Sequence, residues 1–296
     1  LTPSPLFSTG VLGASLLTLG GNDSQKQTYL PQIVDGTLTT ALALEESNRH
    51  APYSIDTQAK KNGDQFIISG CKNFVIDGHS SNLLIVAART EGSVNDESGI
   101  TLFLVNSDSQ GVEITKTSMV DSRNAANIKF SDVTVSSDNI LGEENNGASL
   151  LEVVLDRAQI AISAEMLGNA SQAFNLTLEY LKERKQFGAV IGTFQALQHR
   201  AAEMYSELEL TKSSVIAACN AVDENSNDLR RMASLAKFKS GETNHLITNE
   251  AVQMHGGVGV TDEYDVGLFM KRARVTEQIF GNSEYHIDRY ATLSDY

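Results

Sequence analysis

The stretch Leu150–Ala170, LLEVVLDRAQIAISAEMLGNA, decides the fold class of this chain. Its apolar residues return every three or four positions, the spacing that places them on one face of a helix. The same spacing continues to Arg184 and stops at Gly188. The stretch therefore predicts a long helix whose apolar face packs against other helices.

The sequence downstream predicts the helices that pack against it. Thr193 is a plausible N-cap for a second long helix reaching about Val222, and a third begins near 226–228 and ends at His255. Two shorter helices are expected around Tyr264–Ala273 and Ser283–Thr292. Long helices joined by short loops predict a four-helix bundle over residues 146–296.

The sequence upstream, residues 38–145, is typical of a β-domain. Short runs rich in Val, Ile, Thr and Phe alternate with turn residues such as Asn62-Gly63-Asp64 and Asp77-Gly78. The expected strands are Thr39–Leu44, Gln65–Ser69, Asn73–Ile76, Leu83–Ala88, Ile100–Val105, Val112–Thr115, Asn127–Phe130 and Val133–Val135. Many short strands at this spacing predict an antiparallel barrel or sandwich, so the fold class is α+β with several domains.

Residues 1–37 are expected to be the remainder of an N-terminal helical domain. Asp23 or Ser24 is the expected cap of a short helix that ends near Pro31. The chain opens at Leu1 rather than at Met, which suggests that a preceding segment exists.

Composition excludes several classes of function. The net charge of −14 and the pI of about 4.8 argue against nucleic acid and anionic membranes as partners. No apolar run is long enough for a membrane span, and no signal peptide is visible. Cys71 and Cys219 are far apart and form no metal-binding spacing with the scattered histidines, so no metal is expected. Two reduced thiols favour a cytoplasmic location.

Several ordered segments are similar to motifs of one enzyme family. Ala41–Glu46 (ALALEE) resembles an "ALTEP" run, Gly70–Gly78 resembles "G-x-K-x-W/F-I-T/S-N-G", and Ile140–Gly147 resembles "lLGeeg-G". Further motifs of the same family, "ER-x-Q/T-FG…FQ", "EAVQ-x-x-GG-x-G" and "EGTSE", are matched by Glu183–Gly188 with Phe194-Gln195, by Glu250–Gly259 and by Gly281–Glu284. The order of these blocks resembles the acyl-CoA dehydrogenases. The resemblance implies a middle β-domain, a C-terminal four-helix domain and FAD as cofactor.

The resemblance implies a set of FAD-binding residues in the C-terminal half. They are Arg184, Gln186, Phe187, Gln195, Gln253, Gly256, Gly257 and Asn282. Arg184 supplies charge for a pyrophosphate, and paired glycines let a cofactor approach the backbone. By resemblance the Arg184 segment contacts the FAD of a neighbouring subunit. The structural alternatives are a cation at a helix C-terminus for Arg184 and an ordinary helix C-cap for the glycines.

The β-domain offers fewer flavin contacts. Phe74 lies where the family has Trp or Phe against the flavin ring, although an ordinary core aromatic is the alternative. Two flavin-contacting hydroxyls of the family are replaced by Leu44 and Ile76, and the proline of "TEP" is replaced by Glu46.

The usual catalytic base is also missing. An ungapped comparison places Phe280 where the family has the Glu of "Y-E-G-T", and phenylalanine cannot accept a proton. Some members carry the base on the first long helix before an arginine, and the matching pair here is Asp156-Arg157. Asp156 is thus the candidate base and Arg157 a candidate substrate contact. The alternative is that Asp156 is a salt-bridged or solvated helix carboxylate.

Two functional hypotheses remain open. The first is an active dehydrogenase that oxidises an acyl-CoA thioester and passes electrons to an electron-transfer flavoprotein, as the resemblance implies. The second is a non-catalytic subunit that completes the FAD site of a related chain in a heteromer. A homo-oligomer is expected in the first case and a pair of unlike dehydrogenase subunits in the second.

Overall fold

The computed structural model describes all residues, 1–296, and the chain divides into two compact units. The β unit comprises Pro3–Ala158, and the helical unit comprises Gln159–Tyr296 together with Leu1–Thr2. The boundary lies within one long helix, α3 (Gly147–Glu183).

The β unit contains an eight-stranded sheet with the order β6-β7-β3-β2-β4-β5-β8, and β1 pairs with β4 beside this path. Its strands are β1 (Thr40–Ala43), β2 (Gln58–Asn62), β3 (Gln65–Ile76), β4 (Leu83–Arg89), β5 (Ile100–Asn106), β6 (Val112–Ser118), β7 (Asn124–Ser136) and β8 (Ile140–Leu141). All seven residues of β4 are buried, which explains why its first six, 83–88, are apolar. Most ladders are antiparallel, as predicted, but β4 pairs in parallel with β1 and with β2.

Two predicted strand pairs are single strands in the structure. Gln65–Ser69 and Asn73–Ile76 belong to β3, which keeps its pairing with β7 through register shifts at 68–70 and 72–75. Asn127–Phe130 and Val133–Val135 likewise belong to β7. A bulge adds a residue without ending a strand, so the breaks in the sequence pattern were misleading. Strand β2 was not predicted because its sequence, QAKKN, is mostly polar.

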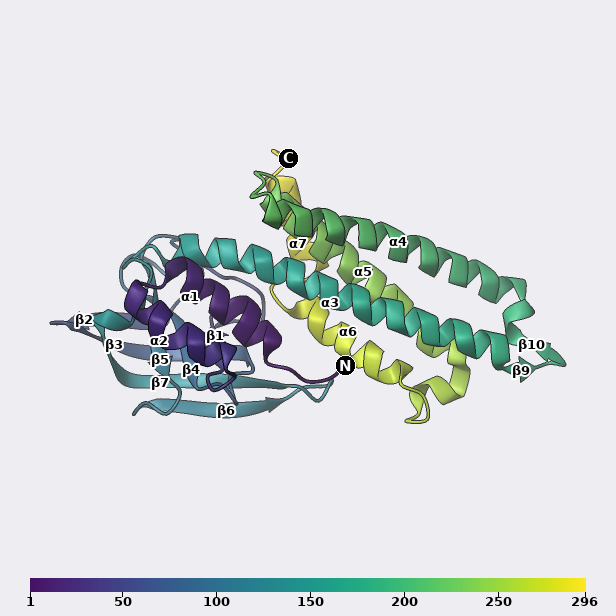
Figure 1. The fold of residues 1–296 in the computed structure, drawn as a ribbon, viewed down its shortest axis with the longest axis horizontal. Coiled ribbons are helices and arrows are strands. Elements are labelled where there is room, and N and C mark those ends of the chain that lie inside the picture. The colour runs from purple at the N-terminus through teal and green to yellow at the C-terminus, as the bar shows by residue number, and fades with distance from the viewer. The chain divides into compact units, whose positions relative to one another are not determined.

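Short helices lie over the sheet (Figure 1). They are η1 (Leu6–Gly13), α1 (Ala14–Gly20) and α2 (Asp23–Val34). The predicted cap of α2 at Asp23 or Ser24 is wrong, because Asn22 forms a reciprocal capping box with Gln25. The predicted end near Pro31 is also wrong. Proline removes only its own N–H donor, and the helix continues to Val34, with the Pro31 carbonyl accepting from the Asp35 amide at 2.9 Å.

The helical unit confirms the predicted bundle. It contains most of α3, together with α4 (Gln195–Asp223), α5 (Leu229–His255), α6 (Val266–Gln278) and α7 (Ser283–Thr292). Four of these helices share one apolar core, to which α3 contributes Phe174, α4 Met204, α5 Ile247 and α6 Val266. The predicted cap at Thr193 is wrong. Thr193 ends a short 3-10 turn, and Phe194 precedes α4 without a side-chain cap.

Candidate functional site

Three phenylalanines have left-handed backbone conformations, and all three are residues that the sequence singled out. They are Phe74 with φ 51°, Phe187 with φ 54° and Phe280 with φ 54°. The other non-glycine residues with positive φ are Ser122 and a set of Asp and Asn residues, the types most often found in this region. A bulky residue keeps such a conformation only where its surroundings enforce it, which is common at functional sites.

Phe74 lies in the bulge of β3, where the ladder with β7 shifts register between Lys72 and Val75. Its amide donates to Asn127 Oδ1 at 3.2 Å. The preceding Asn73 amide donates to the Glu45 carbonyl at 2.7 Å. The side chain is only partly buried, so an apolar ring remains available to a ligand.

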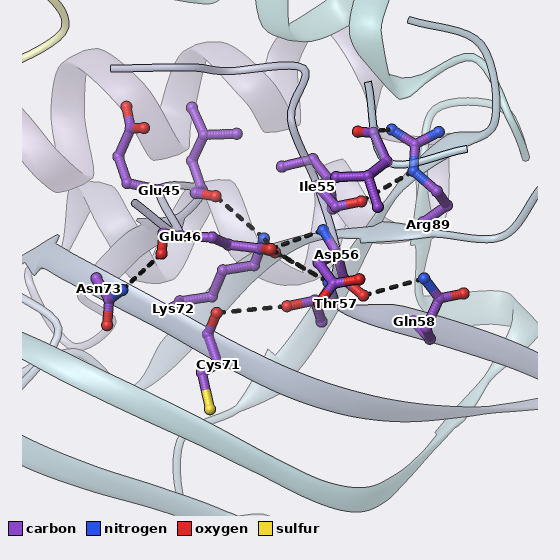
Figure 2. Close-up of polar contacts among 12 residues, drawn as sticks. Glu45, Glu46, Ile55, Asp56, Thr57, Gln58, Cys71, Lys72, Asn73 and Arg89 are labelled. Carbon is purple, nitrogen blue, oxygen red and sulfur yellow. Dashed lines mark hydrogen bonds and ion pairs between the residues drawn. The ribbon is translucent and has the colours of Figure 1, made fainter. Parts of the chain in front are cut away.

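A polar network lies beside this bulge, and Figure 2 shows Glu46 at its centre. The Glu46 carboxylate accepts from Lys72 Nζ at 2.6 Å, from the Asp56 amide at 2.6 Å and from the Thr57 amide at 3.1 Å. Lys72 is fully buried, and burial lowers the pKa of its amine to about 8 against the opposing effect of Glu46. Burial alone raises the pKa of Glu46, but the Lys72 ammonium and the hydrogen bonds bring the net pKa below its usual value.

The two residues that stand where the family motif has a hydroxyl, Leu44 and Ile76, have no side-chain hydrogen-bond donor. Leu44 is 1% exposed, and Ile76 is an apolar residue at the end of β3. The β unit therefore contributes an aromatic ring through Phe74 but no hydroxyl at either position.

One predicted set of FAD contacts gathers in a hairpin after α3. Strands β9 (Lys185–Gln186) and β10 (Ala189–Val190) pair antiparallel around Phe187 and Gly188, both with positive φ, as a two-residue hairpin requires. Arg184, Gln186 and Gln195 are exposed, and Phe187 is 91% exposed. Phe187 and Phe194 meet edge to face with centroids 6.3 Å apart.

The second set lies where α5 ends. Gly256 has φ 67° and ψ −146°, a conformation open in practice only to glycine. A Cβ at Gly256 or Gly257 would meet nothing within 4 Å, and Gln253 is exposed one turn earlier. The backbone is thus open to a ligand, as a cofactor lying on the glycines requires.

An aromatic stack brings these two sets to the same end of the bundle. Tyr180, one turn before Arg184, stacks on His255 at 4.2 Å and donates its hydroxyl hydrogen bond to the His255 carbonyl at 3.2 Å. His255 Nδ1 contacts the Ala251 carbonyl at 2.7 Å, and burial lowers the pKa of the ring. His255 Nε2 is buried without a hydrogen-bond partner. The open backbone at the glycine pair, the exposed side-chain amides of the glutamines and the exposed guanidinium of Arg184 suit the pyrophosphate and adenosine of FAD.

The loop around Phe280 lies elsewhere in the helical unit and is held through its backbone. The Phe280 carbonyl accepts from Gln159 Nε2 at 3.4 Å and lies 3.0 Å from His286 Nε2. Lys237 Nζ donates to the carbonyls of Glu277 at 3.0 Å and Gly281 at 2.7 Å. Lys237 is 2% exposed, and burial lowers the pKa of its amine to about 7.

Asn282 and the pair Asp156-Arg157 complete the predicted set. The side chain of Asn282 caps α7 by accepting from the Tyr285 amide at 3.1 Å. Asp156 lies on α3 and is 2% exposed, so it is not a solvated carboxylate. The Nε atom of the neighbouring Arg157 is buried without a hydrogen-bond partner.

Sequence reasoning missed Lys72 and Lys237 as structural residues. A signal was present for Lys72, which interrupts the buried apolar residues of β3. The buried residues of α5 around Lys237 include Ser234, Ser240 and Gly241, so that face gave no comparable signal. No group of His, Cys, Asp or Glu side chains is arranged to hold a metal ion. Nor does any helix combine the length and apolar character needed to cross a membrane.

Comparison with known proteins identifies the family. The profile of the acyl-CoA dehydrogenase middle domain matches residues 41–133, and that of the acyl-CoA dehydrogenase C-terminal domain matches residues 145–292. A probable acyl-CoA dehydrogenase of Bacillus subtilis, YngJ, is 34% identical over 92% of this chain and 73% of its own length. The short/branched chain specific acyl-CoA dehydrogenase of Bos taurus is 31% identical over 92% of this chain. The chain spans only 63% of the length of that bovine relative.

The fold agrees with this match. The structure of butyryl-CoA dehydrogenase from Megasphaera elsdenii superposes with a TM-score of 0.93 at 30% identity, covering 99% of this chain and 77% of that protein. Sequence and structure thus lead to one conclusion: the chain belongs to the acyl-CoA dehydrogenases, a family of FAD-dependent oxidoreductases.

Proposed function

We propose that this protein is an FAD-dependent dehydrogenase of acyl-CoA thioesters and that an electron-transfer flavoprotein accepts its electrons. The open glycine turn beside the exposed Arg184 hairpin is the observation that carries this proposal. Relatives support the substrate class, since they include a short-chain acyl-CoA dehydrogenase of Megasphaera elsdenii. A subunit of a caffeyl-CoA reductase–Etf complex from Acetobacterium woodii, 32% identical, supports the electron acceptor.

The proposed chemistry divides between cofactor and chain. FAD, when bound, accepts the hydride that leaves the β-carbon of the acyl group. The chain must remove the α-proton, and Asp156 is the proposed base because Phe280 has no acceptor for it. Its burial limits exchange of the proton with bulk water. Arg157 is proposed to lie near the thioester.

The bundle also supports FAD binding across an interface. The Phe280 loop contacts Gln159, and the glycine turn contacts Tyr180 of the same helix. These residues are 21 positions apart, which is ~30 Å along α3. The two places therefore lie far apart along α3. The residues proposed to hold the adenosine end of a neighbour's FAD are Arg184, Phe187, Gln195, Gln253, Gly256 and Gly257.

The arrangement of domains and the location are part of the same proposal. We propose a helical remainder at 1–37, a middle β-domain at 38–145 and a C-terminal bundle at 146–296. The two cysteines are free thiols, which supports a cytoplasmic location.

A related, non-catalytic role is supported by a different observation. The apolar residues Leu44 and Phe280 leave this chain's own site without a hydroxyl and without the usual base. A subunit that only completes a partner's FAD site needs neither group. The two roles differ in the ratio of FAD to chain.

Substitution of Gly257 by alanine should weaken FAD binding without weakening the fold. The added methyl group meets nothing in the protein, and the Gly257 backbone is not left-handed. It would instead occupy the space that the cofactor needs, and a ~10-fold weaker Kd is expected, ~1.4 kcal/mol. Fluorescence titration with FAD and thermal unfolding of the FAD-free protein measure the two quantities.

Gly168→Ala is the matched control. Gly168 lies in α3, and a Cβ there also meets nothing within 4 Å. Its alanine variant should keep the native FAD affinity and be slightly more stable. Unchanged FAD affinity in Gly257→Ala would remove the glycine turn from the cofactor site.

A further inference from the structure

Glu46 and Lys72 join the end of β1 to β3 in the interior of the β unit. Lys72 Nζ donates both to Glu46 Oε1 at 2.6 Å and to the Leu44 carbonyl at 3.0 Å. The same carboxylate holds the amides of Asp56 and Thr57, which begin the return of the chain toward β2 (Figure 2). One ion pair therefore fixes three segments of the chain.

This junction continues directly into the strained bulge at Phe74. Asn73 Nδ2 donates to the Glu46 carbonyl at 2.7 Å, and the Asn73 amide donates to the Glu45 carbonyl at 2.7 Å. Phe74 follows with φ 51°, and its own amide is held by Asn127 Oδ1. Hydrogen bonds from Lys72 and Asn73 thus connect this segment of β3 with the carbonyls of residues 44–46.

The charges in this junction depend on each other. Glu46, Glu45 and Arg89 are the charged groups that act on the Lys72 amine, and Glu46 is the one in direct contact. The carboxylate of Glu45 is engaged elsewhere, by His50 Nδ1 at 2.5 Å and the Ala51 amide at 3.3 Å. Removing Glu46 leaves a buried ammonium with no contacting carboxylate, an unfavourable state that the junction must rearrange to relieve.

We propose that the Glu46–Lys72 pair is the positioning device of Phe74, holding its left-handed backbone so that the ring is presented to the flavin. The orientation toward the flavin rests on the proposed function, whereas the control of the bulge does not. Glu46 occupies the position at which the family motif has a proline. An ion pair therefore takes the place of a conformationally restricted residue.

Backbone amide exchange of the FAD-free protein tests the control of the bulge. Glu46→Ala should accelerate exchange at Asn73 and Phe74 by at least ~10-fold, since their hydrogen bonds open when the junction loosens. Glu46→Gln, which keeps an acceptor, should give a smaller change. The amides of Ile85 and Phe103 in the sheet centre should stay protected, which shows that the protein is folded.

Glu144→Gln is the matched control, because Glu144 forms an ion pair with Lys61 at 2.9 Å on the surface of the same unit. It should leave exchange at Asn73 and Phe74 unchanged. Native exchange at both amides in folded Glu46→Ala would overturn the proposal. Lys72→Met should accelerate exchange at the same two amides as Glu46→Ala does. Native exchange at these amides in folded Lys72→Met would also overturn the proposal.

FAD affinity then tests the presentation of the ring. Glu46→Ala should weaken FAD binding ~10-fold where residue 74 is phenylalanine and less than ~2-fold in a Phe74→Ala background, because the effect acts through the ring. Equal losses in both backgrounds would show a general structural effect and overturn positioning through Phe74. If the native protein binds no FAD at all, the proposed function fails, and the exchange experiment still decides whether the pair controls the bulge.

Discussion

Replacing Asp156 by asparagine should slow the bleaching of bound flavin by an acyl-CoA by a factor of ~10²–10⁴, the usual contribution of a general base. Asparagine has nearly the same shape but cannot accept the α-proton. Asp156 is buried on α3, so its side chain has little contact with solvent. Anaerobic stopped-flow absorbance of the flavin measures the rate.

The control for this substitution lies on the same helix. Glu179 is an exposed carboxylate of α3 paired with Lys182 at 2.7 Å, and Glu179→Gln should bleach at the native rate. FAD content must be equal in all three proteins, since loss of cofactor would mimic loss of the base. A native rate in FAD-loaded Asp156→Asn would show that another group removes the proton.

Replacing Lys237 by methionine should destabilise the protein by ~2–6 kcal/mol. Methionine fills a similar volume, but the carbonyls of Glu277 and Gly281 lose their shared buried donor, and each buried unsatisfied group costs ~1–3 kcal/mol. Lys212 is a suitable control, because it is an exposed lysine of α4 and its methionine variant should lie within ~0.5 kcal/mol of native. Urea unfolding measures both, and equal stability of the two variants would contradict the assigned role.

The same variant has a testable pH dependence. The pKa of Lys237 is about 7 in the folded protein and 10.5 when unperturbed. Between these values the unfolded chain holds a proton that the folded chain lacks, so this lysine makes stability rise with pH, by at most ~1.4 kcal/mol per pH unit. Below pH 7 the contribution is constant. The slope between about pH 7.5 and about pH 9, inside that window, should be smaller in Lys237→Met than in the native protein.

Much of the helical unit could be predicted from the sequence. Helix α5 ends at His255 as expected. It is followed by Gly256, whose φ of 67° and ψ of −146° are accessible in practice only to glycine. Helix α7 has the predicted bounds Ser283–Thr292, since Asn282 provides a side-chain cap. The start of α4 was missed because no polar side chain caps it, so the residue at the N-cap position carries no sequence signal.

The site could be predicted as a set of positions but not as a geometry. Phe74, Phe187 and Phe280 were chosen by resemblance, and nothing in a phenylalanine indicates a positive φ. Two of the three also have hydrogen-bond partners distant in sequence, Asn127 for Phe74 and Gln159 for Phe280. The Glu46–Lys72 contact joins residues 26 positions apart, and local pattern carries no information about such a pairing.

The ratio of FAD to chain in the native protein, purified without any related subunit, tests the central claim most directly. We expect equal numbers of FAD molecules and chains in a homo-oligomer, with each FAD held partly by the Arg184 hairpin and glycine turn of a neighbour. A chain that carries no FAD alone, and half as many FAD molecules as chains with a related subunit, would contradict a self-sufficient dehydrogenase and establish the non-catalytic role.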